Sequence, residues 1–285
     1  MERVRKSTMK KRGVVMFAHN NSKRNYYRMA LAAAKRVKHF LNLPVTLITG
    51  PVTLYKAPEL DVFDEIIIDD PDYSNKRDGA EWINKNRFNV WRLTPYYETL
   101  LLDVDYVVNS DKLLKLFDIF DDYMFHDSTS FIMDPNAPQE YLSTKSFQSL
   151  WATVLIFKKN KNSRHLFQCM EMIQDNFNHY ADIHGFIGGM YRNDYSLTLA
   201  SRIVNGHILP RKNIIPWNLL HVGKNTKISH YKNDEYDIID KNTNTKFMVE
   251  YDNWQRRKIK KEYIFIKDTD FHMLNKDNFD GLFVV

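Results

Sequence analysis

The fold is decided by one stretch of the chain, Tyr97 to Ser110, which reads YETLLLDVDYVVNS. Three leucines in a row between polar residues indicate a strand that is buried on both faces, as in a parallel α/β sheet. The apolar run stops at Asp103, and a single valine separates it from Asp105. Because side chains alternate along a strand, we expect these two carboxylates to share one face at its C-terminal end.

This pair of carboxylates predicts a site for a divalent cation. Mg²⁺ or Mn²⁺ fits best, because these ions accept one or two carboxylates, water and the phosphates of a substrate. An Asp-x-Asp motif also occurs by chance where a polar strand end meets solvent. The hydrophobic strand before Asp103 and Asp105 favours the metal site over that alternative.

Composition indicates a globular protein of 285 residues, near the upper size of one α/β domain. The sequence has no apolar run of about 18 residues, so we expect no membrane span and no membrane partner. Separately, no obligate protein partner is inferred. Its single cysteine, Cys169, excludes an internal disulfide and suits the reducing cytoplasm.

The net charge of +6 favours an anionic partner such as a nucleotide or nucleic acid.

The N-terminal third predicts the opening of a doubly wound sheet flanked by helices. Strands are expected at 13–19, 45–50 and 65–69, with an amphipathic helix at 26–41 whose start the loop Asn20–Ser22 can cap. Ligands of such sheets bind beyond the C-terminal strand ends. The following residues are therefore expected near the two aspartates: Ala18, His19, Asn20 and Thr49.

Two common nucleotide-binding motifs are missing from the sequence. No G-x-G-x-x-G follows the first strand, and no G-x-x-x-x-G-K-S/T occurs anywhere. This argues against a dinucleotide oxidoreductase and a P-loop kinase. A bound nucleotide must instead have its phosphates neutralised by a metal ion and basic side chains.

The middle of the chain predicts further elements. Up to residue 125 we expect a loop at 70–85, a helix from Arg87 to Leu93 and a helix within 110–125. A long loop at 126–148 is expected to form a lid or to bind an acceptor. After it we expect a strand at 151–157, a helix capped by Ser163 and a helix opened by 191–196. Arg87 either contacts a phosphate or is a solvated surface residue. Asp194 either favours the start of its helix or orients or deprotonates a hydroxyl group in the cleft.

The C-terminal third adds three expectations. The segment 255–261 holds the densest basic cluster, and the residues expected to bind nucleic acid are Arg256, Arg257, Lys258, Lys260 and Lys261. The imidazole of His272 is a suitable third ligand for Mn²⁺. Lys276, on the same segment, is placed to meet a diphosphate.

The order of these pieces resembles the GT-A class of nucleotide-sugar-dependent glycosyltransferases, from Val14 to Lys276. The stretch 98–106 resembles the hydrophobic strand that runs into the family's Asp-x-Asp motif. The segment 191–195 is similar to its Asp-containing helix start. Asp270-x-His272 with Lys276 resembles the late His and Lys of glycogenin-like members, although their H-x-x-G-x-x-K-P-W run is missing.

Within this class the chain is most similar overall to glycosyltransferases of T4-like phages, and among these to the enzymes that put a sugar, arabinose in some phages, on 5-hydroxymethylcytosine in DNA. The resemblance implies a single catalytic domain over 1–285, in which about 13–110 binds a nucleoside diphosphate sugar such as a UDP-sugar and about 111–285 binds the acceptor, here duplex DNA. It implies Asp194 as the catalytic residue and Asp103, Asp105 and His272 as metal ligands. The expected substrate-binding residues are Ala18, His19, Asn20, Tyr26, Arg87, Asp103, Trp151, Asn193, Asn275 and Lys276.

Two other functions stay open. A glycosyltransferase that acts on a saccharide, lipid or protein hydroxyl would need the same metal site and no affinity for DNA. A nucleotidyltransferase or a nucleotide-binding module would share the sheet without transferring sugar. Nucleotidyltransferases usually carry a Gly-rich basic loop after the first strand, and the loop His19–Ser22 is not one.

Overall fold

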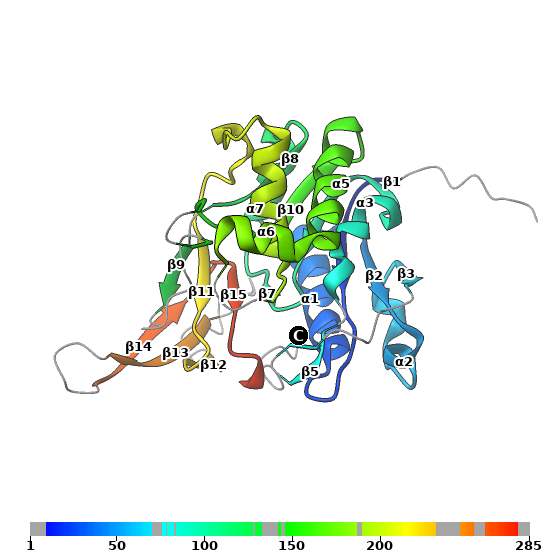
Figure 1. Cartoon of the computed structure of the whole chain (residues 1–285). Coiled ribbons are helices and arrows are strands. Elements are labelled where there is room, and N and C mark those ends of the chain that lie inside the picture. Colours follow the sequence, from blue (N-terminus) through cyan, green and yellow to red (C-terminus); the bar gives the residue numbers. More distant parts are fainter. Residues whose placement is uncertain are drawn as a thin grey trace, which may run out of the picture.

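A six-stranded mixed sheet lies at the centre of the structure, in the strand order β3-β2-β1-β6-β10-β8 (Figure 1). The computed structural model describes residues 10–69, 76–77, 79–82, 84–127, 129–132, 142–143, 146–186, 190–231, 246–253 and 260–278. The strands of the central sheet are β1 (Lys10–Phe17), β2 (Val45–Thr49), β3 (Glu65–Ile68), β6 (Tyr96–Leu102), β8 (Tyr123–His126) and β10 (Trp151–Lys158). The predicted α/β class, a mixed sheet flanked by helices, is confirmed.

The connections between these strands create a switch point in the sheet. β1, β2, β3 and β6 are parallel, whereas β10 is antiparallel to both β6 and β8. From β1 the chain first adds β2 and β3 on one side, and later places β6 on the other side. Ligands of doubly wound sheets bind where the strand order reverses, which here is beyond the ends of β1 and β6.

Helices cover both faces of the sheet because its strands are apolar on both sides. Val14 and Met16 of β1 pack in one core cluster with α1 (Tyr26–Leu41). Val15 and Phe17 pack in a second cluster with α5 (Lys161–Asp175) and α7 (Asn193–Val204). Full burial of an apolar side chain of this size contributes about 1.5–3 kcal/mol to the stability of the fold.

The start of α1 is held by two asparagines. Asn20 Oδ1 accepts a hydrogen bond from the Tyr27 N–H at 2.9 Å, and Asn25, the N-cap residue, accepts one from the Arg28 N–H at 3.0 Å. The expectation that the loop Asn20–Ser22 caps this helix is therefore confirmed for Asn20. The same contacts fix the loop that follows β1, at the edge where a ligand would bind.

A smaller sheet lies against the central one, in the order β7-β15-β11-β9. Its strands are β7 (Tyr106–Val107), β9 (Thr129–Ile132), β11 (Leu219–Val222) and β15 (Phe271–Met273). The antiparallel pairing of β7 with β15 brings the C-terminal segment beside the turn that follows β6. A third, three-stranded sheet holds β12 (Lys227–Tyr231), β13 (Lys246–Asn253) and β14 (Lys260–Ile266).

The remaining elements are short. They are α2 (Pro51–Leu54), α3 (Val90–Leu93), α4 (Leu116–Ile119), α6 (Phe177–His184), the paired strands β4 (Lys76–Arg77) and β5 (Ala80–Glu81), and the 3-10 helices Leu60–Val62, Asn84–Asn89, Lys112–Lys115, Arg211–Asn213 and Lys276–Asn278. Within the part of the chain that the structure describes, no helix has the length and apolar character needed to cross a membrane.

The short helix expected within 110–125 is confirmed over 112–119, as a 3-10 turn followed by α4, and 123–126 instead pairs with β10 as β8. Two other local predictions are wrong. The helix expected to be capped by Ser163 has Asn160 as its N-cap, and Ser163 completes the capping box three residues later. The expected loop 70–85 contains the strand pair β4–β5, and the expected loop 126–148 contains β9, which pairs with the distant strand β11.

Candidate functional site

A cleft of about 690 Å³ opens beyond the C-terminal ends of β1 and β6. From the first part of the chain, the predicted residues that line it are His19, Tyr26, Arg87, Asp103 and Asp105. From the second part, they are Trp151, Asn193, Asp194, His272, Asn275 and Lys276. Residues far apart in sequence, predicted separately, therefore meet in one cavity.

Ala18 and Asn20 do not line the cleft. Ala18 is fully buried, and its carbonyl oxygen accepts a hydrogen bond from the Thr49 hydroxyl. Asn20 caps α1 through its side chain and donates its N–H to the Thr53 hydroxyl at 2.9 Å. Both residues shape the loop after β1 rather than the cavity surface.

The two aspartates lie in a turn, and not on one face of a strand as predicted. β6 ends at Leu102, and the Tyr106 N–H donates to the Asp103 carbonyl at 3.1 Å, which closes the turn before β7. Two long-range hydrogen bonds hold the turn: the Asp103 N–H donates to Thr153, and the Asp105 carbonyl accepts from the Met273 N–H, each at 2.9 Å. The turn still points both carboxylates into the cleft.

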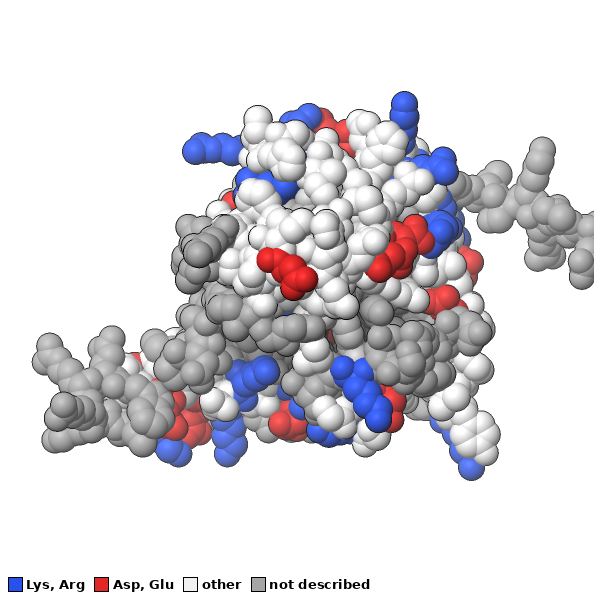
Figure 2. Space-filling view, in the orientation of Figure 1, with Lys and Arg blue, Asp and Glu red and all other residues white. Residues whose placement is uncertain are grey.

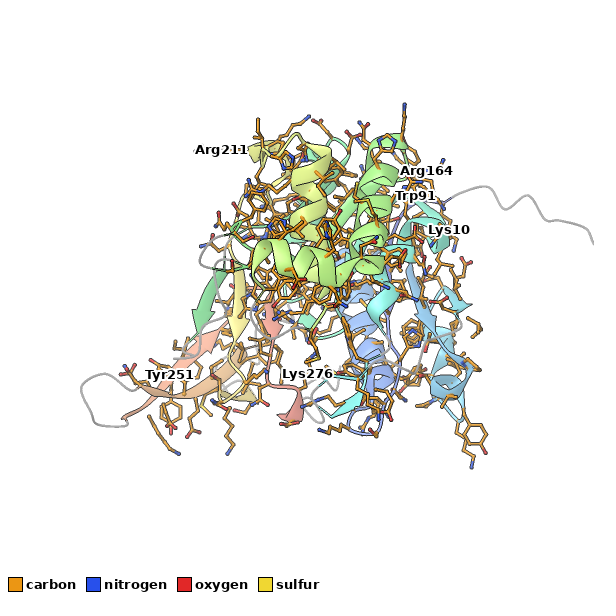
Figure 3. All side chains as sticks on the ribbon, viewed as in Figure 1. Lys10, Trp91, Arg164, Arg211, Tyr251 and Lys276 are labelled. Carbon is orange, nitrogen blue, oxygen red and sulfur yellow. The ribbon has the colours of Figure 1, made fainter. Side chains whose placement is uncertain are left out.

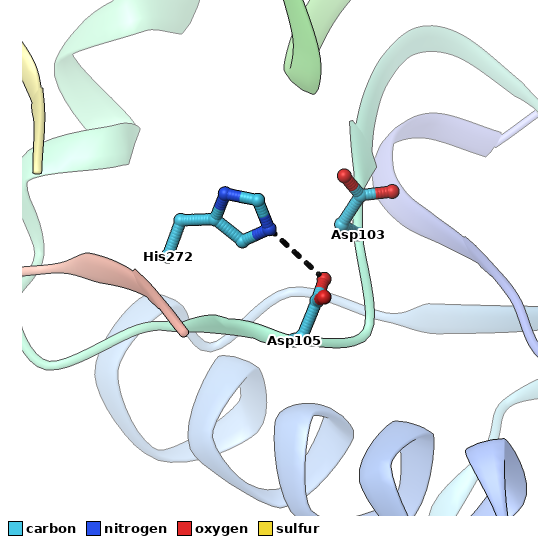
Figure 4. Close-up of side chains that lie close together, drawn as sticks. All are labelled: Asp103, Asp105 and His272. Carbon is cyan, nitrogen blue, oxygen red and sulfur yellow. Dashed lines mark ion pairs between the residues drawn. The ribbon is translucent and has the colours of Figure 1, made fainter. Parts of the chain in front are cut away.

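Asp105 is the centre of the charged cluster. Its carboxylate is buried, with Oδ2 2.6 Å from Lys276 Nζ and Oδ1 3.4 Å from His272 Nε2 (Figure 4). Asp103 is more open, with 29% of its side chain exposed, and it forms an ion pair with Arg87. Lys276 also lies over the ring of Tyr26, 5.5 Å from its centroid, where the C-terminal segment meets α1 (Figure 3).

The two carboxyl groups have pKa values that shift in opposite directions. Burial acts to raise the pKa of Asp105, but Lys276 and His272 outweigh it and hold that pKa below its usual range. Burial raises the pKa of Asp103 despite the opposing attraction of Arg87. Burial also acts to lower the pKa of Lys276, yet the attraction of Asp105 raises it. Asp105 and Lys276 are thus a charged pair at neutral pH.

The cluster fits a divalent metal ion. Asp103, Asp105 and His272 each offer a ligand atom, and these atoms lie within 4.8 Å of one another. Two carboxylate oxygens and one imidazole nitrogen suit Mn²⁺, and the oxygens suit Mg²⁺. Among the described residues, no second group of three such side chains gathers in this way.

The cleft also contains a buried cation with spare hydrogen-bond donors. The Arg87 side chain is 7% exposed, and its Nη1 pairs with Asp103. Its Nε and Nη2 have no hydrogen-bond partner among the described residues. Buried donors are normally satisfied, so this guanidinium is placed to receive an anionic ligand.

Asp194 is already engaged on both oxygens. Oδ1 accepts from the Ala152 N–H at 3.0 Å, and Oδ2 accepts from Arg192 Nη2 at 2.7 Å and Nε at 3.1 Å. Arg192 lines the cleft and lies 5.8 Å from the centroid of the Trp151 ring. The sequence predicts no role for Arg192, since only its contact with Asp194 reveals one.

Behind the metal cluster lies a block of rings. Trp151 packs against His221, with ring centroids 4.4 Å apart, and His221 Nδ1 is 2.9 Å from His272 Nδ1. His221 was missed by the sequence analysis. The sequence feature that could have indicated a buried His221 is its place inside the apolar run Leu219–Val222, which is typical of a buried strand.

The other predicted polar residues have local partners. Asn275 Nδ2 donates to the Thr226 carbonyl at 2.7 Å, and Asn193 Oδ1 accepts from the Tyr191 hydroxyl at 3.3 Å. His19 is 5% exposed, and burial lowers its pKa to about 4. It therefore faces the cleft as a neutral ring at physiological pH.

The predicted nucleic-acid-binding cluster is not part of the cleft, and most of it lies outside the described residues. Arg256, Arg257 and Lys258 lie outside the described residues, and Lys260 begins β14. Lys261 pairs with Glu250 at 2.7 Å. On the face shown in Figure 2, acidic and basic side chains of the described residues are interspersed.

Comparison with known proteins gives structural neighbours alone. No protein-family model matches this chain, and no curated protein matches it. The galactosyltransferase LgtC, solved with donor and acceptor sugar analogues, is similar over 66% of this chain and 69% of its own, with 16% identity and a TM-score of 0.46. Mouse xyloside xylosyltransferase 1 is similar over 70% and 83%, with 13% identity and a TM-score of 0.42.

A further neighbour is the glycosyltransferase GlyE of Streptococcus pneumoniae TIGR4. It is similar over 70% of this chain and 44% of its own, with 15% identity and a TM-score of 0.40. Likeness at this level establishes no activity for the present chain. A functional conclusion must therefore stand on the cleft and its chemistry.

Proposed function

We propose that the protein is a metal-dependent glycosyltransferase, which moves a sugar from a nucleoside diphosphate sugar to a hydroxyl group. The observation that carries this proposal is the meeting of Asp103, Asp105 and His272 with two cations, Lys276 and Arg87, in one cleft at the switch point of the sheet. Transfer of a glycosyl group releases a diphosphate, whose growing negative charge needs such fixed positive partners.

On the donor side, the metal ligands would be Asp103, Asp105 and His272, and Mn²⁺ or Mg²⁺ bound there would supply positive charge that stabilises the leaving diphosphate. Lys276 adds an ammonium group beside the same carboxylate. Arg87 donates the N–H groups of Nε and Nη2 to phosphate oxygens. Together these groups hold the diphosphate in one orientation while the glycosidic bond breaks.

The remaining donor contacts come from the wall of the cleft next to β1. His19 is neutral, so its imidazole can both donate and accept a hydrogen bond with a base or ribose. Tyr26 offers a ring and a hydroxyl group on the same side. In this assignment, residues of about 13–110 bind the nucleotide sugar, and UDP is the proposed nucleotide.

On the acceptor side, we assign Asp194 a positioning role. Both of its carboxylate oxygens already accept hydrogen bonds, and it holds Arg192 against Trp151. The guanidinium of Arg192, with the side chains of Asn193 and Asn275, then orients the acceptor hydroxyl toward the anomeric carbon. An Asp194→Asn variant should accordingly raise the KM for the acceptor more than it lowers kcat.

The finer proposal concerns the acceptor and the sugar. We propose 5-hydroxymethylcytosine in duplex DNA as the acceptor and arabinose as the sugar, on the strength of the family resemblance in the sequence and the net charge of +6. The hydroxymethyl group at C5 of cytosine points into the major groove, where a side chain can reach it, or the base leaves the stack.

One experiment tests both the glycosyltransferase activity and the proposed acceptor and sugar. The protein is incubated with Mn²⁺ and a panel of nucleotide sugars, together with plain DNA, hydroxymethylated DNA or oligosaccharides, and the products are analysed by mass spectrometry. A sugar on hydroxymethylcytosine supports the finer proposal. A sugar on a saccharide alone keeps the glycosyltransferase and removes DNA. Absence of sugar release from every donor contradicts the proposed activity.

Transfer to a saccharide, lipid or protein hydroxyl is the second candidate. The interspersed charges on the face shown in Figure 2, and the pairing of Lys261 with Glu250, are the observations that support this alternative. The salt dependence of DNA binding separates the two, because contacts with phosphates weaken steeply as salt rises. Nucleotide binding without sugar release would instead identify a nucleotidyltransferase or a binding module.

A further inference from the structure

Two buried histidines meet behind the metal cluster. His221 on β11 and His272 on β15 are register partners on adjacent parallel strands, so their side chains lie on the same face. Their Nδ1 atoms are 2.9 Å apart, which is hydrogen-bond distance. His221 is fully buried, and 5% of His272 is exposed.

The contact between two Nδ1 atoms constrains the tautomers of both rings. A neutral imidazole has one N–H donor and one acceptor nitrogen, so one ring must donate to the other. Nε2 of His272 faces Asp105 and is the ring nitrogen available to a metal ion. A nitrogen that ligates a metal must present its lone pair, which leaves the proton of His272 on Nδ1.

We propose that His221 is a positioning residue for the metal site: its Nδ1 accepts the Nδ1–H of His272 and fixes that ring in the tautomer whose Nε2 lone pair faces Asp103 and Asp105. This inference rests on the proposed metal-dependent function. Metal-bound histidines generally donate their second N–H to a partner of this kind, and loss of the partner weakens metal binding about 10–100-fold.

The surroundings of His221 hold its ring in place. β11 is paired on one side with β15 and on the other with β9, so the backbone of His221 is fixed within the sheet. The ring packs against Trp151, with centroids 4.4 Å apart and planes inclined at 51°. Trp151 and His272 both line the cleft, whereas His221 lies behind them and is not among the lining residues.

The test compares two substitutions that separate hydrogen bonding from packing. His221→Phe keeps a ring against Trp151 and removes the acceptor, whereas His221→Asn places an amide oxygen close to the position of Nδ1 and loses the ring. His126→Phe is the matched control, because His126 is also buried, at 1% exposure, and among the described residues the rings that contact His272 are those of Trp151 and His221. Thermal unfolding checks that each variant is folded.

The first measurement is the affinity for Mn²⁺ alone, by calorimetry. We expect His221→Phe to bind Mn²⁺ about 10–100-fold more weakly than the wild type, with His221→Asn and His126→Phe within about threefold of it. Wild-type affinity in folded His221→Phe overturns the proposal. Equal losses in His221→Phe and His221→Asn also overturn it, because they would assign His221 to packing.

The second measurement follows the tautomer of His272 as Mg²⁺ is added. Nitrogen chemical shifts of the ring, recorded by NMR, report which nitrogen carries the proton. Without metal, Nε2 faces the Asp105 carboxylate and we expect the proton there; with Mg²⁺ bound we expect it on Nδ1. In His221→Phe this change should need about 10–100-fold more Mg²⁺, and in His221→Asn it should not. No change of tautomer in the wild type would contradict the proposed metal site, whereas the same Mg²⁺ dependence in His221→Phe and the wild type would overturn the role of His221.

Discussion

The two walls of the cleft are built in different ways. Asp103 and Asp105 lie in a turn at the end of β6, a strand in the middle of the central sheet. His272 and Lys276 arrive on and just after β15, a three-residue strand of the smaller sheet. The first wall follows from one continuous stretch of sequence, whereas the second depends on pairing between distant segments. Asn109 and Asp270, for example, are joined by a 2.7 Å hydrogen bond across 161 residues.

This difference separates the part of the site that can fold with the sheet from the part that completes it. Leu100, Leu101 and Leu102 are buried between α1 and the helices of the opposite face, so the turn after them has a rigid base. The C-terminal wall, formed by His272 and Lys276, contributes the ammonium group that neutralises Asp105 and an imidazole beside it. Substitutions in the two walls should therefore change different properties: catalysis and metal binding in one case, and the stability of the sheet in the other.

The largest effect is expected at the C-terminal wall. Lys276→Met removes the fixed ammonium group beside Asp105 while keeping a side chain of similar length, and we expect kcat for sugar transfer to fall about 10²–10³-fold. Mn²⁺ affinity should not fall with it, because the metal ligands stay and a competing cation is gone. Steady-state kinetics and calorimetry measure the two quantities. A parallel loss of Mn²⁺ binding would mean that Lys276 mainly builds the site.

The next effect concerns the sheet beneath the other wall. A Cβ on Gly13 would lie 2.3 Å from the ring of Tyr96, which is fully buried and hydrogen-bonded to Thr46. Gly13→Ala should therefore lower the free energy of unfolding by about 1–3 kcal/mol, as overpacking does. Denaturant unfolding measures it. Gly206, where a Cβ meets nothing within 4 Å, is the control for crowding, and its positive φ predicts a loss of about 1 kcal/mol in Gly206→Ala.

We expect acid to lower the free energy of unfolding, because a buried histidine lies at the end of β8. Burial lowers the pKa of His126, at the end of β8, to about 3, whereas an unfolded histidine titrates near 6.5. Between these values the unfolded chain binds a proton that the folded chain does not, so stability falls as pH drops below about 6.5. At pH 5 the loss from this residue is about 2 kcal/mol.

The measurement is the difference in unfolding free energy between pH 7 and pH 5. His126→Phe should shrink that difference by about 2 kcal/mol, whatever its effect at pH 7. Part of the acid sensitivity should persist, because burial also lowers the pKa of His19, to about 4. An unchanged difference in His126→Phe would show that the pKa of His126 is the same in the folded and unfolded protein, against the lowering expected from burial.

The smallest effect is local to α5, which covers the central sheet away from the cleft. Asn160 Oδ1 accepts hydrogen bonds from the N–H groups of Asn162 and Ser163, each at 3.1 Å. Asn160→Ala should cost about 1 kcal/mol of stability and leave donor binding unchanged. Thermal unfolding and nucleotide titration check both parts. Altered nucleotide affinity would show that the two faces of the sheet are more tightly coupled than this account holds.

Much of the central sheet could be predicted because its signal is local. Runs such as Val14–Phe17 and Leu100–Leu102 are apolar at every position, as strands covered on both faces must be. The turn that holds Asp103 and Asp105 was mistaken for the end of a strand. An alternating pattern cannot distinguish the two, and the hydrogen bonds that make the turn come from Thr153 and Met273.

The rest of the site depends on pairings that a single sequence does not display. Nothing local to Leu219–Val222 says that this strand will lie beside Phe271–Met273, so the partner of His272 was missed. Arg192 was overlooked for a similar reason, since its value comes from the contact with Asp194 and Trp151. Trp151 and Arg87 were placed correctly in the cleft, but their neighbours there became clear from the structure.

In the proposed function, Asp105 holds a divalent ion, which in turn binds a nucleoside diphosphate. Calorimetry with Mn²⁺ and a nucleoside diphosphate, on the wild type, Asp105→Asn and the exposed control Asp121→Asn, tests this role. We expect Mn²⁺-dependent nucleotide binding in the wild type and in Asp121→Asn, and a loss of about 100-fold or more in Asp105→Asn. Nucleotide binding in folded Asp105→Asn that equals the wild type, with or without Mn²⁺, would contradict it.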